Sequence, residues 1–227
     1  MRDLIRAFAE DVATHLPIAP PIVEIGARAA AGQEGIADLR SLFPGREYIG
    51  CDVQDGPGVD RIEDVHALSF PDESIGAVLS LDTLEHVADP LRALQEIHRV
   101  LKPGGVVAIS SVMFFPIHAH PWDYWRFTPE GFAQLLQPFE SSLVLPYGYE
   151  LMPETVFGIG VKGPAELSTD LLPRTTAMCD AWARGLRVDL GPLRFSARQL
   201  WGMAAKASLD ATRERIRGRR GATPAPR

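Results

Sequence analysis

The chain has 227 residues, of which 46% are hydrophobic and 23% charged, enough for one globular α/β domain without disulfide or metal staples. The formal net charge is −6, although residues 211–227 alone carry six arginines and one glutamate. The rest of the chain is therefore strongly acidic, which argues against nucleic acid as the main ligand.

The first half of the chain alternates short apolar runs with segments of helical period. An amphipathic helix is expected over residues 2–16, where Pro17 stops it. Ile36, Leu39 and Phe43 mark a further helix face, and Asp89-Pro90 and Thr128-Pro129 begin two more helices as N-cap and first-turn residues. Strands are expected at Ile22–Ile25, Tyr48–Cys51, Val59–Ile62, Ile75–Leu81 and Val106–Ile109, with a turn at Lys102–Gly105 before the last.

Strands that are apolar throughout and separated by helices predict a parallel sheet with crossover helices. The runs Leu143–Tyr147 and Val156–Val161 are too close for such a helix, so we expect an antiparallel pair at one sheet edge. The predicted fold is α/β, a Rossmann-like, mostly parallel sheet of seven strands with an antiparallel terminal strand and a helical C-terminal extension. The expected domain is 1–162, with 163–212 as the extension and 213–227 as a basic, disordered tail.

Neither targeting nor redox chemistry is indicated by the sequence. The longest apolar stretch is too short to span a bilayer, and the N-terminus lacks the apolar core of a signal peptide. Cys51 and Cys179 match no metal-ligand spacing and are expected to be reduced thiols. We therefore expect a soluble, cytoplasmic protein with no membrane span, while its oligomeric state stays open.

Three features follow the ends of the first three predicted strands. Gly26 follows the first strand, Asp52 closes the second, and Asp64-Val65 follows the third. In open α/β sheets, ligands bind outside the carboxyl ends of the strands, where the strand order switches. A glycine there lets the backbone approach a ligand, and carboxylates can accept ribose hydroxyls or read an adenine edge. Each feature alone is commonly a turn or a solvated strand end, so the prediction rests on their joint order.

The chain resembles the class I S-adenosylmethionine (SAM)-dependent methyltransferases, within the group called type 11. The resemblance covers about residues 20–162 and lies in Val23-Glu24-Ile25-Gly26, Tyr48-Ile49-Gly50-Cys51-Asp52, residues 64–72, Leu84-Glu85-His86-Val87-Ala88-Asp89-Pro90 and residues 96–105. It implies SAM as cofactor. It places Glu24 and Gly26 near the methionine part, Asp52 at the ribose, and Asp64 with the Val65 backbone at the adenine.

The first motif departs from the family pattern at two positions. Arg28 and Ala30 stand where glycines are usual, two and four residues after Gly26. A cation facing the sulfonium would repel it, so Arg28 is expected to turn outward or to pair with the methionine carboxylate. The same departure argues against a nicotinamide fingerprint, which needs glycine at position 28.

The densest polar and aromatic cluster follows the fifth strand, at residues 118–128. His118 and His120 are candidate bases that would take a proton from an acceptor hydroxyl, because histidine titrates near neutral pH. Asp123, Tyr124 and Arg126 are candidate acceptor-binding residues, and His86 is the next candidate base. Structural hydrogen bonds are the alternative for each histidine. A metal held by His118, His120 and Asp123 is a weaker alternative, because their spacing is loose, and no metal is predicted.

The predicted function is transfer of a methyl group from SAM to an oxygen of a small-molecule or sugar acceptor, with nitrogen acceptors left open. Similar aromatic loops in type 11 proteins that accompany sugar processing favour a glycan-like acceptor. The alternative is a catalytically silent protein of the same fold that acts as a partner or scaffold, which the Arg28 and Ala30 departure would support.

Overall fold

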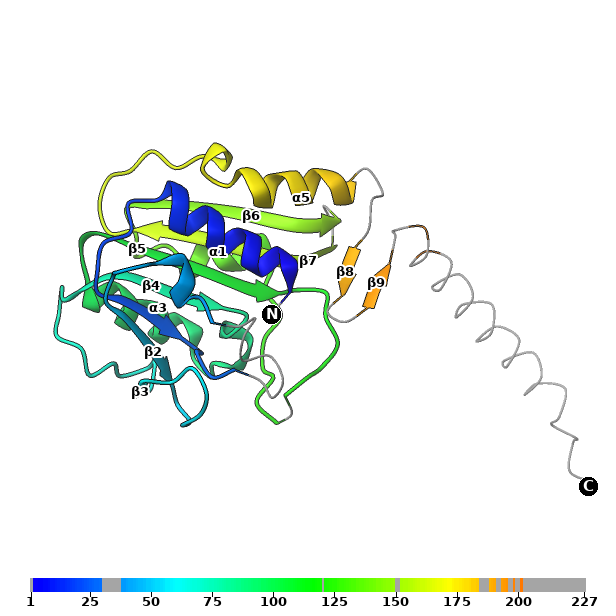
Figure 1. Cartoon of the computed structure of the whole chain (residues 1–227). Helices are drawn as coiled ribbons and strands as arrows, with labels where there is room; N and C mark the ends of the chain where they lie inside the picture. The colour runs from blue at the N-terminus through cyan, green and yellow to red at the C-terminus, as the bar shows by residue number, and fades with distance from the viewer. Residues whose placement is uncertain are drawn as a thin grey trace, which may run out of the picture. The chain divides into compact units, whose positions relative to one another are not determined.

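A seven-stranded sheet forms the centre of the protein (Figure 1). The computed structural model describes residues 2–29, 38–119, 121–149, 152–183, 188–190 and 193–195, with Arg198 and Trp201. The chain divides into two compact units, Met1–Cys179 and Asp180–Arg227, and the sheet belongs to the first.

The sheet has the strand order β3-β2-β1-β4-β5-β7-β6. Its strands are β1 (Ile22–Ile25), β2 (Tyr48–Asp52), β3 (Arg61–Ile62), β4 (Ile75–Leu81), β5 (Leu101–Val112), β6 (Ser141–Tyr149) and β7 (Met152–Val161). The first five pair in parallel, whereas β7 runs antiparallel to both β5 and β6. The order reverses between β1 and β4, which is where ligands bind in sheets of this kind. The predicted fold class and the edge pair are confirmed.

Three predicted elements differ from those observed. The third strand is only Arg61–Ile62. The predicted turn at Lys102–Gly105 lies inside β5 as an irregularity, because the pairing with β4 jumps from Ile75–Leu101 to Ala77–Val106. The chain bulges there, and Gly104 takes a φ of +77°. Of the helix face predicted after β1, Leu39 and Phe43 flank a single 3-10 turn, η1 (Arg40–Leu42), and Ile36 lies outside the described residues.

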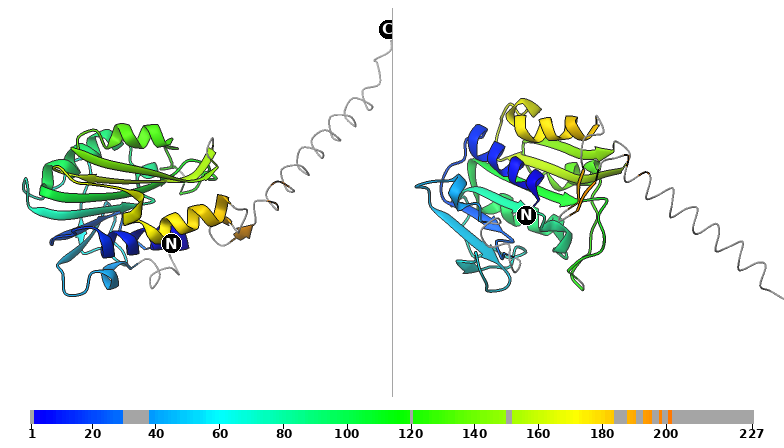
Figure 2. Two further views of the ribbon diagram at one scale, coloured as in Figure 1. Left: turned by 90° about the horizontal axis from the view of Figure 1, so that it is seen from above. Right: turned by 45° about the vertical axis from the view of Figure 1, so that its right-hand side comes forward.

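Helices cover both faces of the sheet (Figure 2). They are α1 (Asp3–His15), α3 (Pro90–Val100), α4 (Pro129–Leu135) and α5 (Pro173–Ala183), with the 3-10 turns η2 (Leu84–His86) and η3 (Thr169–Leu171). The predicted caps are present: Asp89 accepts a hydrogen bond from Arg92 N at 3.1 Å, and Thr128 accepts one from Gly131 N at 3.0 Å. Across the described residues, no helix is long and apolar enough to cross a membrane.

Alternating side chains of the strands separate two apolar layers. On one face, Val23, Val78, Val107 and their neighbours pack with the buried sides of α3 and α4. On the other face lies α1, whose Phe8 ring stacks at 4.5 Å on Phe157 of β7. The start of α5 is tied to α1 because the fully buried Asp11 accepts hydrogen bonds from the Thr175 backbone and hydroxyl, both at 2.8 Å. These layers hold the strand ends in fixed positions.

The second unit contains a strand pair, β8 (Val188–Leu190) with β9 (Leu193–Phe195). This corrects the expectation of helices alone in the C-terminal extension. The sequences Val-Asp-Leu and Leu-Arg-Phe alternate apolar and charged residues, the pattern of a strand. The two runs are short and flank Gly191-Pro192, so a search for helical period passes over them. The predicted disordered tail at 213–227 lies outside the described residues.

Candidate functional site

Gly26 brings the end of β1 against the turn that follows β4. It has a φ of +84°, and a Cβ atom built on it would lie 2.2 Å from Thr83 Oγ1. The Thr83 hydroxyl is itself fixed by hydrogen bonds to the carbonyls of Leu81 (3.0 Å) and Ile25 (3.3 Å). Only glycine therefore allows this close approach, which lies at the reversal of strand order between β1 and β4.

Asp52 and Asp64 lie at the same edge of the sheet as Gly26. The amides of Gly26 and Ala27 both donate to the Cys51 carbonyl, which places Asp52 beside the end of β1. The Asp52 carboxylate accepts from Gln54 N at 2.9 Å and, more weakly, from Arg28 N at 3.4 Å. Because Glu63 N donates to Asp52 O at 3.0 Å, the segment that leads to Asp64 continues alongside the end of β2.

The Asp64 carboxylate is largely exposed, and His66 fixes its orientation. It accepts a hydrogen bond from His66 N at 2.9 Å and contacts the His66 ring at 2.7 Å. These hydrogen bonds, the backbone one foremost, hold the pKa of Asp64 below its usual range. Val65 is buried beside it. The structure thus brings Gly26, Asp52, Asp64 and Val65 to one rim.

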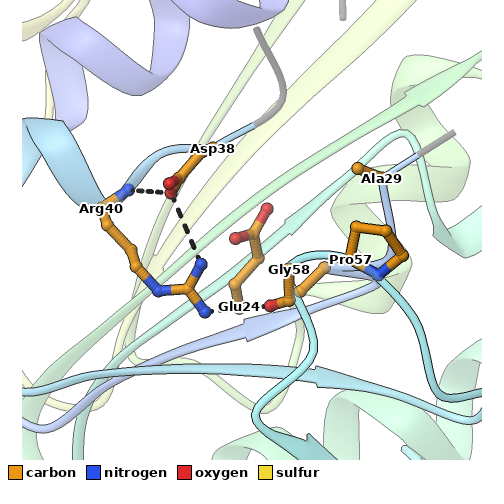
Figure 3. A pocket seen from close by; sticks show the side chains of 7 residues that line it. Glu24, Ala29, Asp38, Arg40, Pro57 and Gly58 are labelled. Carbon is orange, nitrogen blue, oxygen red and sulfur yellow. Dashed lines mark hydrogen bonds and ion pairs between the residues drawn. The ribbon is translucent and has the colours of Figure 1, made fainter. Parts of the chain in front are cut away.

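Glu24 lines a small cavity of about 70 Å³ next to this rim (Figure 3). Its carboxylate accepts a hydrogen bond from the Tyr48 hydroxyl at 2.6 Å. Burial raises the pKa of Glu24 to about 7, although Tyr48 and Arg40 oppose the shift. Arg40 closes one side of the cavity through Asp60 at 2.6 Å and the Gly58 carbonyl at 2.9 Å.

Arg28 is exposed, and its side chain follows the loop after β2. A Cβ atom on Gly56 would come within 2.9 Å of Arg28 Nε, so the side chain lies along that glycine. The neighbouring Ala29 amide donates to Pro57 O at 2.9 Å, which holds the two loops together. Ala30, the other departure from the family pattern, lies outside the described residues.

A buried network joins the N-terminus to the far side of the site. The Arg2 guanidinium contacts both Asp82 oxygens at 3.0 Å, Glu154 Oε1 at 2.7 Å and Thr155 Oγ1 at 2.7 Å. Burial by itself lowers the pKa of Arg2, but the two carboxylates outweigh it and raise the pKa overall. Sequence reasoning did not find this network, because its members are 80 to 153 residues apart.

Glu85 of η2 is the deepest carboxylate of the site. It is fully buried, and its Oε2 accepts a hydrogen bond from Ser111 Oγ of β5 at 2.5 Å. Burial, with the nearby Asp82 charge, raises the pKa of Glu85 to about 7. The backbone carbonyl of Glu85 accepts the amides of Tyr124 and Trp125, at 2.8 and 3.2 Å. Glu85 therefore anchors the loop that follows β5.

Within that loop, Asp123 and Arg126 form an ion pair. Arg126 contacts Asp123 at 2.6 and 2.8 Å and also donates to the carbonyls of Phe115 and Pro116. The Arg126 hydrogen bonds hold the pKa of Asp123 well below its usual range. Asp123 also accepts the His118 amide at 2.7 Å. Asp123 and Arg126, two of the predicted acceptor-binding residues, thus stabilise the loop through their contacts with each other and with its backbone. Tyr124, the third, is 49% exposed.

His118 is brought to Glu85 and His86. Its Nε2 lies 3.9 Å from Glu85 Oε1, and its ring meets the His86 ring edge-on at 4.7 Å between centroids. His86 Nδ1 is 2.7 Å from the Trp122 carbonyl, so both histidines are oriented by the loop. His120, the other predicted base, lies outside the described residues. Glu85 and His86 carried the family resemblance in the sequence, but only the fold places them beside His118.

Residues 36–109 match the family model described as a methyltransferase domain. The chain is 31% identical over 126 residues to a ubiquinone biosynthesis O-methyltransferase of Ruegeria pomeroyi, with 49% of each chain covered. It is 34% identical over 119 residues to a demethylmenaquinone methyltransferase of Clavibacter sepedonicus, covering 47% of this chain and 48% of the relative. The chain thus spans about half the length of these curated relatives.

Among solved structures, a SAM-dependent methyltransferase from Archaeoglobus fulgidus has a TM-score of 0.56 at 16% identity, covering 71% of this chain and 95% of that one. That likeness concerns the fold alone. The chain is thus similar to methyltransferases in sequence over about half of its length, and its fold is like that of a SAM-dependent methyltransferase. The family match includes Asp52 and Asp64 and ends within β5, so it covers part of the rim and leaves out the loop after β5.

The rim formed by Gly26, Asp52, Asp64 and Val65 fits the chemistry of SAM. Asp52 and Asp64 present carboxylates, which accept hydrogen bonds from hydroxyl and amine donors. Arg28 follows the loop after β2, where its guanidinium is solvated. These carboxylates and the position of Arg28 are therefore compatible with a nucleoside that carries a positively charged sulfur.

Proposed function

We propose that this methyltransferase domain transfers a methyl group from SAM to an oxygen of a small-molecule acceptor. The observation that carries the proposal is that the rim at the ends of β1, β2 and β3 lies next to the His118–Glu85 pair. Glu85 follows β4, which pairs with β1, and His118 follows β5, which pairs with β4. The Ruegeria pomeroyi relative is an O-methyltransferase of ubiquinone biosynthesis, which supports an oxygen acceptor.

On this proposal the rim binds and orients the cofactor. Asp52 would accept the ribose hydroxyls, and Asp64 with the Val65 backbone would hold the adenine. Glu24 and Gly26 would border the methionine part. Bound SAM supplies a methyl carbon already activated by its sulfonium, so the protein mainly provides alignment of the two reactants.

The acceptor side would supply a proton acceptor. His118 Nδ1 lies 3.1 Å from the Pro116 carbonyl, which can only accept, so the neutral ring carries its proton on Nδ1 and a lone pair on Nε2. That lone pair can take the proton of an acceptor hydroxyl. The resulting imidazolium would be stabilised by Glu85 and Asp123, whose oxygens lie 3.9 and 3.4 Å from the ring nitrogens.

The exposed aromatic side chains of the same loop favour an acceptor with an apolar or planar part. Trp122, Tyr124 and Trp125 are 55%, 49% and 42% exposed, although the Trp125 indole is fixed by a hydrogen bond to the Val87 carbonyl at 2.8 Å. Such rings stack on aromatic or sugar rings alike. The acceptor proposed is therefore a phenol, a quinol or a sugar.

The test is a thermal-shift titration with SAM and S-adenosylhomocysteine (SAH), followed by mass spectrometry of phenolic and sugar acceptors. A ligand that binds only the folded protein must raise its melting temperature. We expect both nucleosides to do so, and one acceptor class to gain a methyl group. Failure of the wild type to bind millimolar SAM, while Arg28→Gly binds it, would instead support the catalytically silent scaffold.

A further inference from the structure

Three side chains beside the proposed acceptor site form a group suited to a metal ion. One ligand atom each of Glu85, His86 and His118 lies within 4.8 Å of the others. Glu85 and His86 come from η2, and His118 comes from the loop after β5. Among the residues that the structure describes, no other group of histidine, cysteine and acidic side chains meets in this way.

In both histidines, Nε2 has the lone pair that a metal ion would need. His86 Nδ1 is 2.7 Å from the Trp122 carbonyl, and His118 Nδ1 is 3.1 Å from the Pro116 carbonyl. A carbonyl oxygen only accepts, so in each neutral ring the proton is on Nδ1 and the lone pair on Nε2. Metal-binding histidines are oriented by this same contact, a hydrogen bond from the far nitrogen to a carbonyl or carboxylate.

The Glu85 carboxylate has one oxygen bonded and one without a partner. Oε2 accepts the Ser111 hydroxyl, whereas Oε1 is buried with no hydrogen-bond partner among the described residues. Burying an unpaired carboxylate oxygen is costly, and such oxygens in native proteins commonly face a ligand or ion. At 3.9 Å from His118 Nε2, Oε1 is too far for a hydrogen bond and close to the separation of two ligands on one metal.

The charges around the group leave Glu85 without a fixed cation. Arg2 is committed to Asp82 and Glu154, and Arg126 is committed to Asp123. The described residues provide no lysine or arginine within ion-pair distance of Glu85, whose one such contact is His118. A positive ion at this point would complete the electrostatic balance of the four carboxylates and two guanidinium groups.

We propose that Glu85, His86 and His118 bind one divalent transition-metal ion of the zinc class. Two imidazoles and a carboxylate are ligands typical of zinc, and three protein ligands leave a coordination position open for a substrate oxygen. Bonds of about 2.0–2.2 Å place ligand atoms about 3–4 Å apart. A small inward movement of the side chains therefore completes the site.

The consequence for catalysis rests on the proposed function. A metal at this site would bind the acceptor hydroxyl and lower its pKa, so the proton would pass to solvent. In the metal-bound protein His118 would serve as a ligand, which replaces its role as the proton acceptor in the metal-free protein. The oxygen would then form its bond to the methyl carbon as the carbon–sulfur bond breaks, and SAH would leave with the electron pair on sulfur. Metal binding itself requires neither SAM nor an acceptor.

The test is a titration of the full, tag-free chain with ZnCl₂ after removal of metals with a chelator. Isothermal calorimetry and elemental analysis after desalting measure affinity and stoichiometry, and a Co²⁺-substituted sample reports the ligand geometry through its visible spectrum. We expect one ion per chain and a loss of affinity of at least about 100-fold in Glu85→Gln, His86→Gln and His118→Gln. His15→Gln, a half-exposed histidine of α1, is the matched control and should bind as the wild type does.

Two results would overturn the site: no tight ion in the wild type, or unchanged affinity in all three variants. Circular dichroism and melting temperature show whether each variant is folded, and the glutamine substitutions keep approximate side-chain size. If one variant does not fold, the other two still decide the outcome. A SAH thermal shift on metal-free protein separates this proposal from the proposed function, because it reports cofactor binding alone.

Discussion

Gly26→Ala provides a sharp test of how β1 and β4 meet at the rim proposed to bind the cofactor. Two penalties combine at this position. The first is backbone strain, because at a φ of +84° a side chain costs about 1–2 kcal/mol. The second is overlap with Thr83, whose Oγ1 and Cγ2 would lie 2.2 and 2.7 Å from the new Cβ.

Relief of the overlap would require Thr83 to move, which would break the hydrogen bonds from its hydroxyl to the Ile25 and Leu81 carbonyls. Overpacking of this kind costs about 1–3 kcal/mol. The total expected loss in the free energy of unfolding is therefore about 2–5 kcal/mol. For a protein of this size the melting temperature falls by about 2–4 °C for each kcal/mol.

Gly45→Ala is the matched control. Gly45 has a φ of +71° with no atom within 4 Å of its would-be Cβ, so it carries the strain without the overlap. We expect urea denaturation to show a loss of about 1–2 kcal/mol there. Adding Thr83→Ala to Gly26→Ala should recover the excess, which a double-mutant cycle measures as a coupling energy. Equal destabilisation of Gly26→Ala and Gly45→Ala would refute the close approach of the two strand ends.

Four further predictions concern cofactor, base, pH and packing. Asp52→Ala should weaken SAH binding by about 1–3 kcal/mol in calorimetry, and an unchanged affinity would remove Asp52 from the site. His118→Ala should lower turnover by about 10²–10⁴-fold with SAH affinity intact; wild-type turnover would rule out a catalytic role. Because the folded-state pKa of Glu24 is raised from 4.5 to about 7, the folded protein holds a proton that the unfolded chain releases. Its stabilising effect is complete below pH 4.5 and is lost as the pH rises to about 7, so Glu24→Gln should flatten the stability profile there; parallel profiles would contradict the shift. Asp11→Ala should cost about 2–5 kcal/mol in chemical denaturation, since it leaves the buried Thr175 donors unpaired, and a loss below 1 kcal/mol would show that another group replaces it.

Local patterns in the sequence were sufficient to predict most of the strands and two helix N-caps. Short, mainly apolar runs predicted β1 and β4 with their observed bounds, because strands buried on both faces need no alternation. Asp89 and Thr128 marked helix starts, since an N-cap side chain satisfies amides only two or three residues away. The short connection between β6 and β7 indicated an antiparallel pair. Each of these signals lies within a few residues of the element that it predicts.

Contacts between distant segments were decided only by the tertiary structure. The sequence placed Gly26, Asp52 and Asp64 at strand ends, but the pairing of β1 with β4 is what set Gly26 against Thr83. Likewise, β4 beside β5 brought the turn that holds Glu85 to the loop that holds His118. Such contacts depend on strand order and register, and they leave no periodic trace along the chain because the partners are dozens of residues apart. Residue types and local elements were thus determined by the sequence alone, whereas the side chains that meet in the site were decided by the packing of the sheet.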